Sequence, residues 1–167
     1  MESNIMKLPS KVRWLSVPTP VPITPVNVYT LKGPLGYYLI DGGVGTEEAG
    51  KIIKDWLPYP LAGILITHSH YDHIGYAAEI AREQGCPIHL TSEEIRILKD
   101  PQSRIRDYAR VLSQAGVPEA EFNQAVEAVK KVRQVHSAQF AGIEAEELVP
   151  GQKFITELGA LEVIFTP

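Results

Sequence analysis

The chain has 167 residues, of which 44% are hydrophobic and 22% are charged, so it holds enough apolar material for one sizeable core in a single domain. Its net charge of −4 disfavours a dedicated nucleic-acid binder, because such proteins usually present a basic face. A single cysteine, Cys86, permits no internal disulfide, and no run approaches the about 18 apolar residues of a membrane span. These properties predict a cytoplasmic protein with no nucleic-acid or membrane partner.

The first third of the chain predicts a meander of mostly antiparallel strands. Alternating or apolar segments at Val12–Val17, Val26–Leu31 and Tyr37–Ile40 predict three strands, the last of which ends at Asp41–Gly42–Gly43. The proline-rich segment Pro18–Pro25 lacks ladder donors and is stiff, so we interpret it as a rigid connector. A preformed loop at the mouth of a site is the alternative.

The middle of the chain alternates helices and strands, which is typical of an α/β fold. Thr46 is expected to cap a helix, and the apolar run Leu61–Ile66 predicts a strand that is buried on both faces. A helix over Gly75–Gln84 and a short strand over Ile88–Leu90 follow, and the capping-box sequence Thr91–Ser92–Glu93–Glu94 is expected to open another helix. His89 lies inside that strand, and we expect a strand residue there rather than a metal ligand, because no second ligand stands near it.

Two further helices, over residues 100–135, are expected to form a hairpin inserted into the α/β unit. The segment Arg96–Arg133 carries a net charge of +3, whereas the remainder carries −7. Solvated helix faces explain this charge most simply. The alternative is that basic residues flank a pocket and attract an anionic substrate; they are Arg104, Arg106, Arg110, Lys130, Lys131 and Arg133. His136 stands alone after the hairpin, so we do not expect it to be a ligand.

The last residues predict a second hairpin, with strands over Phe154–Thr156 and Leu161–Phe165 and a turn over Leu158–Gly159–Ala160. Ile164 interrupts the alternation of the second strand. We therefore expect burial on both sides of that strand.

The most informative stretch is Thr67–His73, which follows the buried strand and holds three of the chain's five histidines beside an aspartate. In an extended segment, residues two apart point the same way, so His68 and His70 can converge on one ion. After a turn, Asp72 and His73 can face a second ion about 3.5–4 Å away. Imidazole and carboxylate are suitable ligands for zinc and related ions. Unrelated histidines on a surface loop are the alternative interpretation.

This stretch matches the T-H-x-H-x-D-H signature of the metallo-β-lactamase-fold hydrolases, and the chain resembles their glyoxalase II-like branch. The resemblance implies an α/β fold of the αββα sandwich type. It implies that His68 and His70 bind one metal and that Asp72 and His73 bind the second. It further implies that Asp72 orients the nucleophile and that Asp41 orients a ligand from behind.

The family's next histidine motif typically reads T-P-G-H-x-x-G-H, and the sequence given ends at Phe165–Thr166–Pro167. We therefore expect residues 1–167 to form the first part of a metallo-β-lactamase-like domain, with the helical insertion at residues 100–135. Such a chain would hold zinc sub-stoichiometrically and turn over poorly.

The resulting prediction is a metal-dependent hydrolase, with one or two zinc ions and with iron or manganese as alternatives. Metal-bound hydroxide would attack an ester, thioester, amide or phosphoester of a small-molecule substrate, whose binding residues the sequence does not identify. Two other hypotheses remain open. One is a non-catalytic half-domain that associates with itself or with a complementing chain through an uncovered sheet face. The other is an iron-dependent oxygenase of the same fold.

Overall fold

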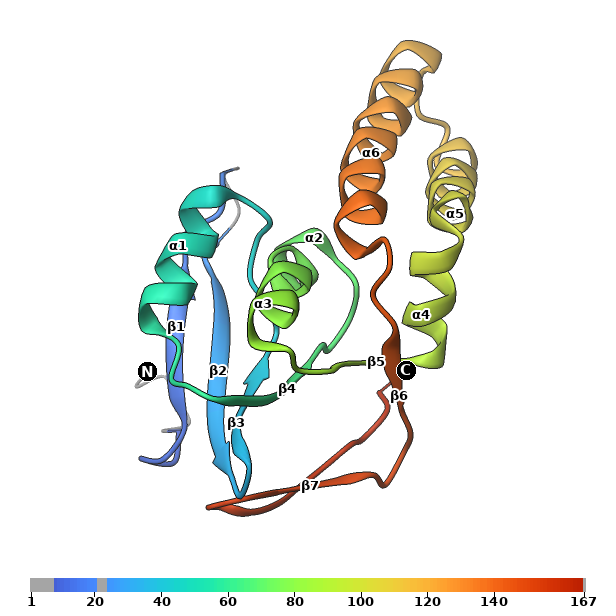
Figure 1. Cartoon of the computed structure of the whole chain (residues 1–167). Coiled ribbons are helices and arrows are strands. Elements are labelled where there is room, and N and C mark those ends of the chain that lie inside the picture. The colour runs from blue at the N-terminus through green and yellow to red at the C-terminus, as the bar shows by residue number, and fades with distance from the viewer. Residues whose placement is uncertain (1–7, 21–23, 167) are drawn as a thin grey trace, which may run out of the picture.

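A computed structural model describes residues 8–20 and 24–166 of the chain, so the connector Pro18–Pro25 lies partly outside the described residues. Its centre is a mixed six-stranded sheet of order β1-β2-β3-β4-β5-β6 (Figure 1). The first three strands pair antiparallel and the last four pair parallel, which confirms the predicted α/β class. The strands are β1 (Arg13–Val17), β2 (Val26–Gly33), β3 (Gly36–Ile40), β4 (Leu61–Leu65), β5 (Ile88–Thr91) and β6 (Ala145–Leu148).

The helices begin and end close to the capping and terminating residues that the sequence contains. The Thr46 hydroxyl accepts a hydrogen bond from the Ala49 amide at 3.2 Å. Gly85 ends a helix with a left-handed φ of 61°. The helices are α1 (Glu47–Trp56), α2 (Tyr71–Ile74), α3 (Ala77–Gln84), α4 (Ser92–Lys99), α5 (Pro101–Gln114) and α6 (Glu119–Phe140).

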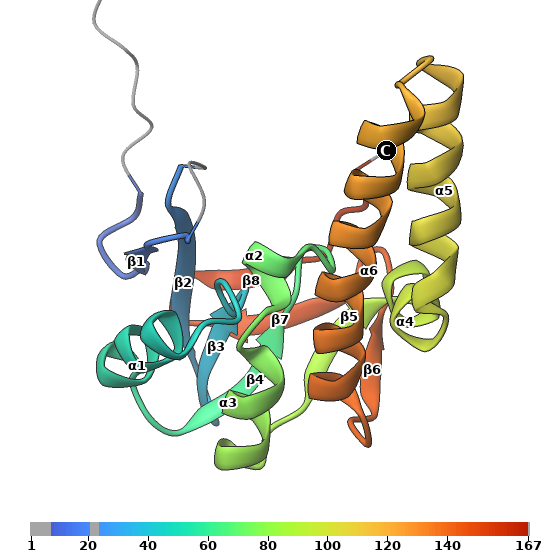
Figure 2. The same ribbon diagram turned by 90° about the horizontal axis from the view of Figure 1, so that it is seen from above.

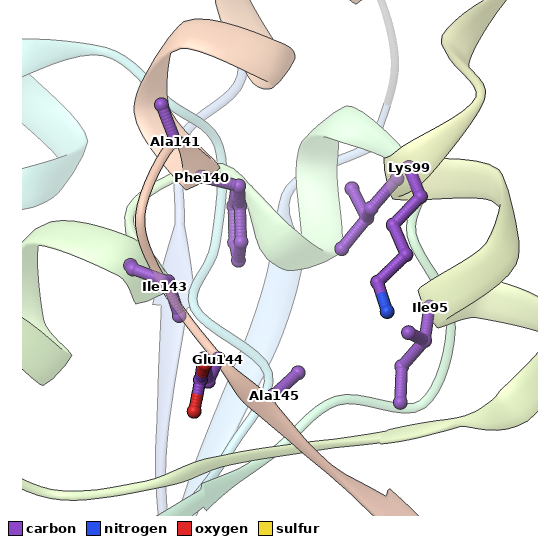
Figure 3. Close-up of a pocket in the computed structure, with 8 residues that line it drawn as sticks. Ile95, Lys99, Phe140, Ala141, Ile143, Glu144 and Ala145 are labelled. Atoms are coloured by element: carbon purple, nitrogen blue, oxygen red, sulfur yellow. The ribbon is translucent and has the colours of Figure 1, made fainter.

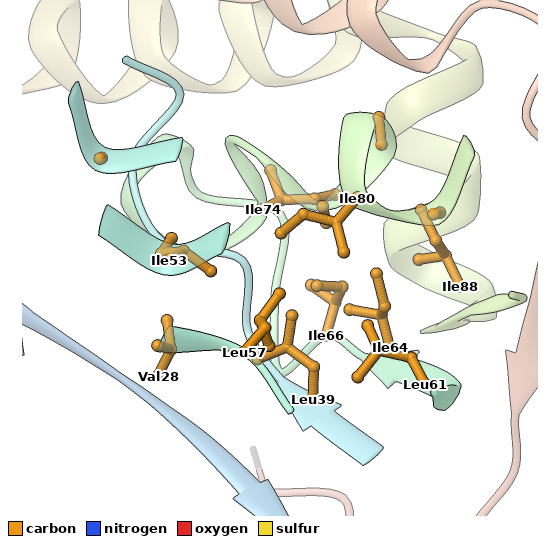
Figure 4. Packing of buried hydrophobic residues seen from close by; sticks show 14 of the residues in the cluster. Val28, Leu39, Ile53, Leu57, Leu61, Ile64, Ile66, Ile74, Ile80 and Ile88 are labelled. Atoms are coloured by element: carbon orange, nitrogen blue, oxygen red, sulfur yellow. The ribbon is translucent and has the colours of Figure 1, made fainter. Parts of the chain in front are cut away.

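One face of the sheet packs against α1, α2 and α3 and carries the main core; we call it the helix face (Figure 4). Leu39 and Ile64 point into this core and are fully buried. The pairing of β3 with β4 skips Ala62, and this irregularity places Leu61 on the same face as Ile64. Further members of this core are Val28, Ile53, Ile66, Ile74, Ile80, Ile88 and Leu90.

The opposite face, which we call the hairpin face, is covered by a two-stranded hairpin, β7 (Lys153–Thr156) and β8 (Gly159–Glu162). Its core is a small cluster of Leu65, Leu148 and Phe154, against which Tyr38 and Leu161 pack. Apolar side chains of adjacent residues in β4 thus point to opposite faces, as strand geometry requires.

The burial of His89 and of Ile164 tests two of the sequence predictions. His89 is only 5% exposed and its ring lies 5.2 Å from the Phe154 ring, which confirms a packed strand residue. Ile164 is 77% exposed, so the prediction that it is buried on both sides is wrong. Strand β8 ends at Glu162, because its pairing with β7 stops there. The turn predicted at Leu158–Gly159–Ala160 lies one to two residues too late in the sequence, since Thr156 already pairs with Gly159.

Helices α5 and α6 pack side by side and project from the β5–β6 side of the sheet (Figure 2). Helix α6 continues to Phe140, five residues past the end expected from the sequence. His136 therefore belongs to α6, and its side chain lies outside the described residues. Among the described residues, no helix is long and apolar enough to span a membrane.

Candidate metal centre

The stretch Thr67–His73 lies at the carboxyl end of β4, where open α/β sheets place their sites. The turn after β3 packs closely against it: the Gly42 amide donates to the His73 carbonyl at 2.5 Å, and the Asp41 amide donates to Leu65 at 3.0 Å. A Cβ on Gly75 would clash with the Gly45 backbone nitrogen, so only glycine permits this approach. The loop is therefore fixed from two sides by backbone contacts.

Asp41 is the buried anchor of the stretch, with only 4% of its surface exposed. Its carboxylate accepts hydrogen bonds from the Thr67 amide at 2.9 Å, from the Thr67 hydroxyl at 3.0 Å and from His73 Nδ1 at 2.7 Å. Its backbone has a φ of 61°, in the left-handed region that aspartate tolerates better than most residues. One side chain thus ties together both ends of the histidine stretch.

The structure brings all four predicted ligands into one cluster. His68 Nε2 lies 3.1 Å from His70 Nδ1, and the His68 and His73 ring centroids are 4.2 Å apart. His73 Nε2 lies 3.7 Å from the nearer Asp72 carboxylate oxygen. The rings contact one another, and among the described residues no three His, Cys, Asp or Glu side chains are arranged to hold an ion as they stand. Ligation would therefore require the side chains of the cluster to rotate.

The hydrogen bonds around the rings favour particular tautomers. Because the Asp41 carboxylate can only accept, His73 Nδ1 carries a proton and its Nε2 keeps a free lone pair. The Thr67 hydroxyl donates to Asp41, so its oxygen can accept from His68 Nδ1 at 3.0 Å, which leaves His68 Nε2 unprotonated. Each of these two rings therefore carries an unprotonated Nε2, which in His68 accepts from His70 Nδ1. Two such nitrogens form a donor set that fits a borderline divalent ion.

The pKa values of His68 and His73 are shifted in opposite directions. The hydrogen bond to Asp41 raises the pKa of His73 above its ordinary value and outweighs the effect of burial. Burial lowers the pKa of His68, and the neighbouring His73 lowers it further. His68 thus holds a proton less readily than a free imidazole does, whereas His73 holds one more readily.

A hollow of about 290 Å³ opens beside His70. Its remaining wall comes from the helix pair, namely Arg104, Asp107, Tyr108 and Val111 of α5 and Val129 of α6. Two other arginines expected to flank a pocket pair with exposed acids, Arg106 with Asp100 at 2.8 Å and Arg110 with Asp107 at 3.4 Å. Among those of the six basic residues whose side chains the structure describes, Arg104 is the one that lines this hollow.

A second hollow, of about 450 Å³, lies between α4 and the segment that joins α6 to β6 (Figure 3). No residue of the histidine stretch lines it, and its wall is mostly aliphatic, with Phe140 at its base. We therefore do not include it in the site.

Comparison with known proteins gives consistent results. The sequence model described as the metallo-beta-lactamase superfamily matches residues 21–148. A hydroxyacylglutathione hydrolase of Bradyrhizobium sp. is 32% identical in an alignment of 89 positions that covers 48% of this chain and 35% of that protein. A probable metallo-hydrolase of Streptococcus pyogenes is 31% identical in an alignment of 86 positions that covers 50% of this chain and 36% of that protein. The chain thus matches about a third of the length of these curated relatives.

A solved structure extends the similarity to nearly the whole chain. The crystal structure of a metallo-beta-lactamase family protein from Thermus thermophilus superposes with a TM-score of 0.72 at 27% identity. The superposition covers 94% of this chain and 52% of that protein.

Proposed function

This chain belongs to the metallo-β-lactamase superfamily, and from that premise we propose that it acts as a metal-dependent hydrolase of a small-molecule ester, thioester, amide or phosphoester. The observation that carries the proposal is the anchoring of His73 by the buried Asp41 carboxylate at 2.7 Å, in a cluster with His68, His70 and Asp72. An outer carboxylate that fixes a histidine's orientation is the usual support of a metal ligand.

We assign the metal ligands to His68, His70, Asp72 and His73, with zinc as the first candidate and manganese or iron as alternatives. When bound, such an ion lowers the pKa of a coordinated water and stabilises negative charge on the substrate oxygen. Asp72 accepts a hydrogen bond from the attacking water and so orients it. Asp41 holds the His73 ring so that Nε2 faces the cluster, and the hollow beside His70 receives the substrate.

Zinc binding by the purified, chelator-treated chain tests the ligand assignment. The zinc affinity is measured by competition with a chromophoric chelator. It should fall at least about tenfold in each of His68→Ala, His70→Ala and His73→Ala, since each change removes a proposed metal ligand. His89→Gln changes a histidine outside the cluster and should leave the affinity unchanged. Equal affinities in all variants would overturn the assignment.

Hydrolysis is tested next, with an activated ester, a phosphodiester and a hydroxyacylglutathione thioester, the last chosen because a relative is named for that substrate. We expect metal-dependent turnover of at least one of these compounds, abolished by chelation and reduced in Asp72→Asn. Protein that purifies with iron and consumes oxygen instead would favour the oxygenase hypothesis and overturn the hydrolase. Because Cys86 can form no disulfide within the chain, we place this activity in the reducing cytoplasm.

A further inference from the structure

Ser69 is the residue between the first two histidines of the cluster, and it is fully buried. Its hydroxyl donates a hydrogen bond to Glu94 Oε2 in the first turn of α4. Glu94 is itself only 8% exposed, and its amide is capped by the Thr91 hydroxyl at 3.3 Å. A carboxylate is therefore buried directly behind the His68–Ser69–His70 backbone.

The same carboxylate has a second partner from the helix pair. Arg104 Nη2 on α5 donates to Glu94 Oε1 at 3.1 Å. The Arg104 side chain also lines the hollow beside His70, and its buried Nε has no hydrogen-bond partner within the described part of the chain. Glu94 thus links the wall of the hollow to the backbone that carries two histidines.

Burying a carboxylate is costly unless it is paired and hydrogen-bonded, and both conditions are met here by Ser69 and Arg104. Breaking such a pair leaves an uncompensated charge, so the arrangement resists movement of the loop. The preceding residue provides a contrast: the Glu93 carboxylate pairs with Arg96, its neighbour on the surface of the same helix, at 2.6 Å, and among the described residues it makes no hydrogen bond to the histidine stretch. Two adjacent glutamates therefore differ in whether they hydrogen-bond to the histidine loop.

We propose that Glu94 is a positioning residue of the metal centre: it holds Ser69 so that the flanking His68 and His70 rings converge, and Arg104 couples this hold to the substrate-facing helix α5. The inference rests on the proposed function, since it assumes that the two histidines bind metal. In this role Glu94 acts through the Ser69 hydroxyl and not as a ligand of the metal.

Zinc affinity and the visible spectrum of the cobalt(II)-substituted protein test this role without an activity assay. Glu94→Gln keeps the side-chain shape but removes the charge that pairs with Arg104, so zinc affinity should fall by about 10–100-fold and the cobalt bands should shift. Glu93→Gln, the matched control, should bind zinc within twofold of the wild type. Ser69→Ala removes the hydroxyl that donates to Glu94, so it should weaken zinc binding as well. The loss in the double variant should be smaller than the product of the two single losses, because both changes act on the connected Ser69–Glu94–Arg104 contacts.

The outcomes separate the two proposals. The positioning role would be overturned if Glu94→Gln and Ser69→Ala both kept the wild-type zinc affinity and cobalt spectrum while His68→Ala lost zinc affinity. That result would leave the hydrolase proposal standing. A wild-type chain that binds no zinc overturns both proposals. Circular dichroism verifies the fold of each variant, and if Glu94→Gln does not fold, Ser69→Ala decides the question, since it removes one hydroxyl group.

Discussion

The two faces of the sheet are packed very differently. On the helix face, Leu39, Ile64, Ile66 and Ile74 are at most 1% exposed. On the hairpin face, Leu65, Leu148 and Phe154 are 7–8% exposed, and few other side chains join them. Ile66 and Ile74 flank the histidine stretch on either side, so the helix face is the one that holds the candidate site in place. From this difference we expect that stability, and the metal binding proposed above, depend mainly on one face.

The largest effect is expected from Ile64→Ala on the helix face. It removes a fully buried side chain from the densest packing, so the free energy of unfolding should fall by about 4 kcal/mol. Urea denaturation measures the loss. A loss under about 2 kcal/mol would mean that this face relaxes around the cavity and that the contrast between the faces is smaller than the burial indicates.

Phe154→Ala removes the central ring of the hairpin face, including its edge-to-face contact with Tyr38 at 5.3 Å. We expect a loss of about 3 kcal/mol in unfolding free energy, because the ring is nearly buried but its cluster is small. Zinc affinity should remain within twofold of the wild type, since the ring supports the face away from Ile66 and Ile74. Impaired zinc binding in a folded variant would contradict the assignment of the site to the helix face.

Protonation of His89 on the hairpin face should make the free energy of unfolding depend on pH. Burial lowers the pKa of His89, against the opposing effect of the Glu146 carboxylate at 3.4 Å. The unfolded chain therefore binds this proton more readily than the folded one, and stability should fall as the pH drops below about 6.5, the unfolded value. In metal-free protein, unfolding free energies at pH 7.5 and 5.5 should differ less in His89→Gln than in the wild type. His68 and His73 are shared by both proteins, so equal differences would contradict the assignment to His89.

The smallest effect is expected from Ile155→Ala, on the outward side of β7. Ile155 is 56% exposed, unlike its neighbour Phe154. Its truncation should change the unfolding free energy by no more than about 0.5 kcal/mol. A larger loss, measured by the same urea titration, would show that the outer side of the hairpin is covered in solution.

The sequence predicts those parts of the fold that depend on neighbours along the chain. The caps at Thr46 and Thr91 and the buried strand before His68 are set by local pattern, and the structure has them. Strand β6 was missed, because Ala145–Leu148 lacks alternation and is extended only through its pairing with β5. The partner of Ser69 was missed for a related reason: Glu94 lies 25 residues away, and its position in a capping sequence explains it without any reference to the loop.

Asp41 combines a left-handed backbone with a buried carboxylate, and these two properties impose opposite demands on the residue. The conformation costs most L-amino acids about 1–2 kcal/mol, which glycine would not incur. Glycine would remove that cost, but it would also remove the acceptor of the Thr67 and His73 hydrogen bonds. Each of those losses costs about 1–3 kcal/mol, so Asp41→Gly should lower the thermal stability of the metal-free chain as well as its retention of zinc. A library randomised at this position should therefore return aspartate under either selection, because the same carboxylate serves folding and the proposed metal site.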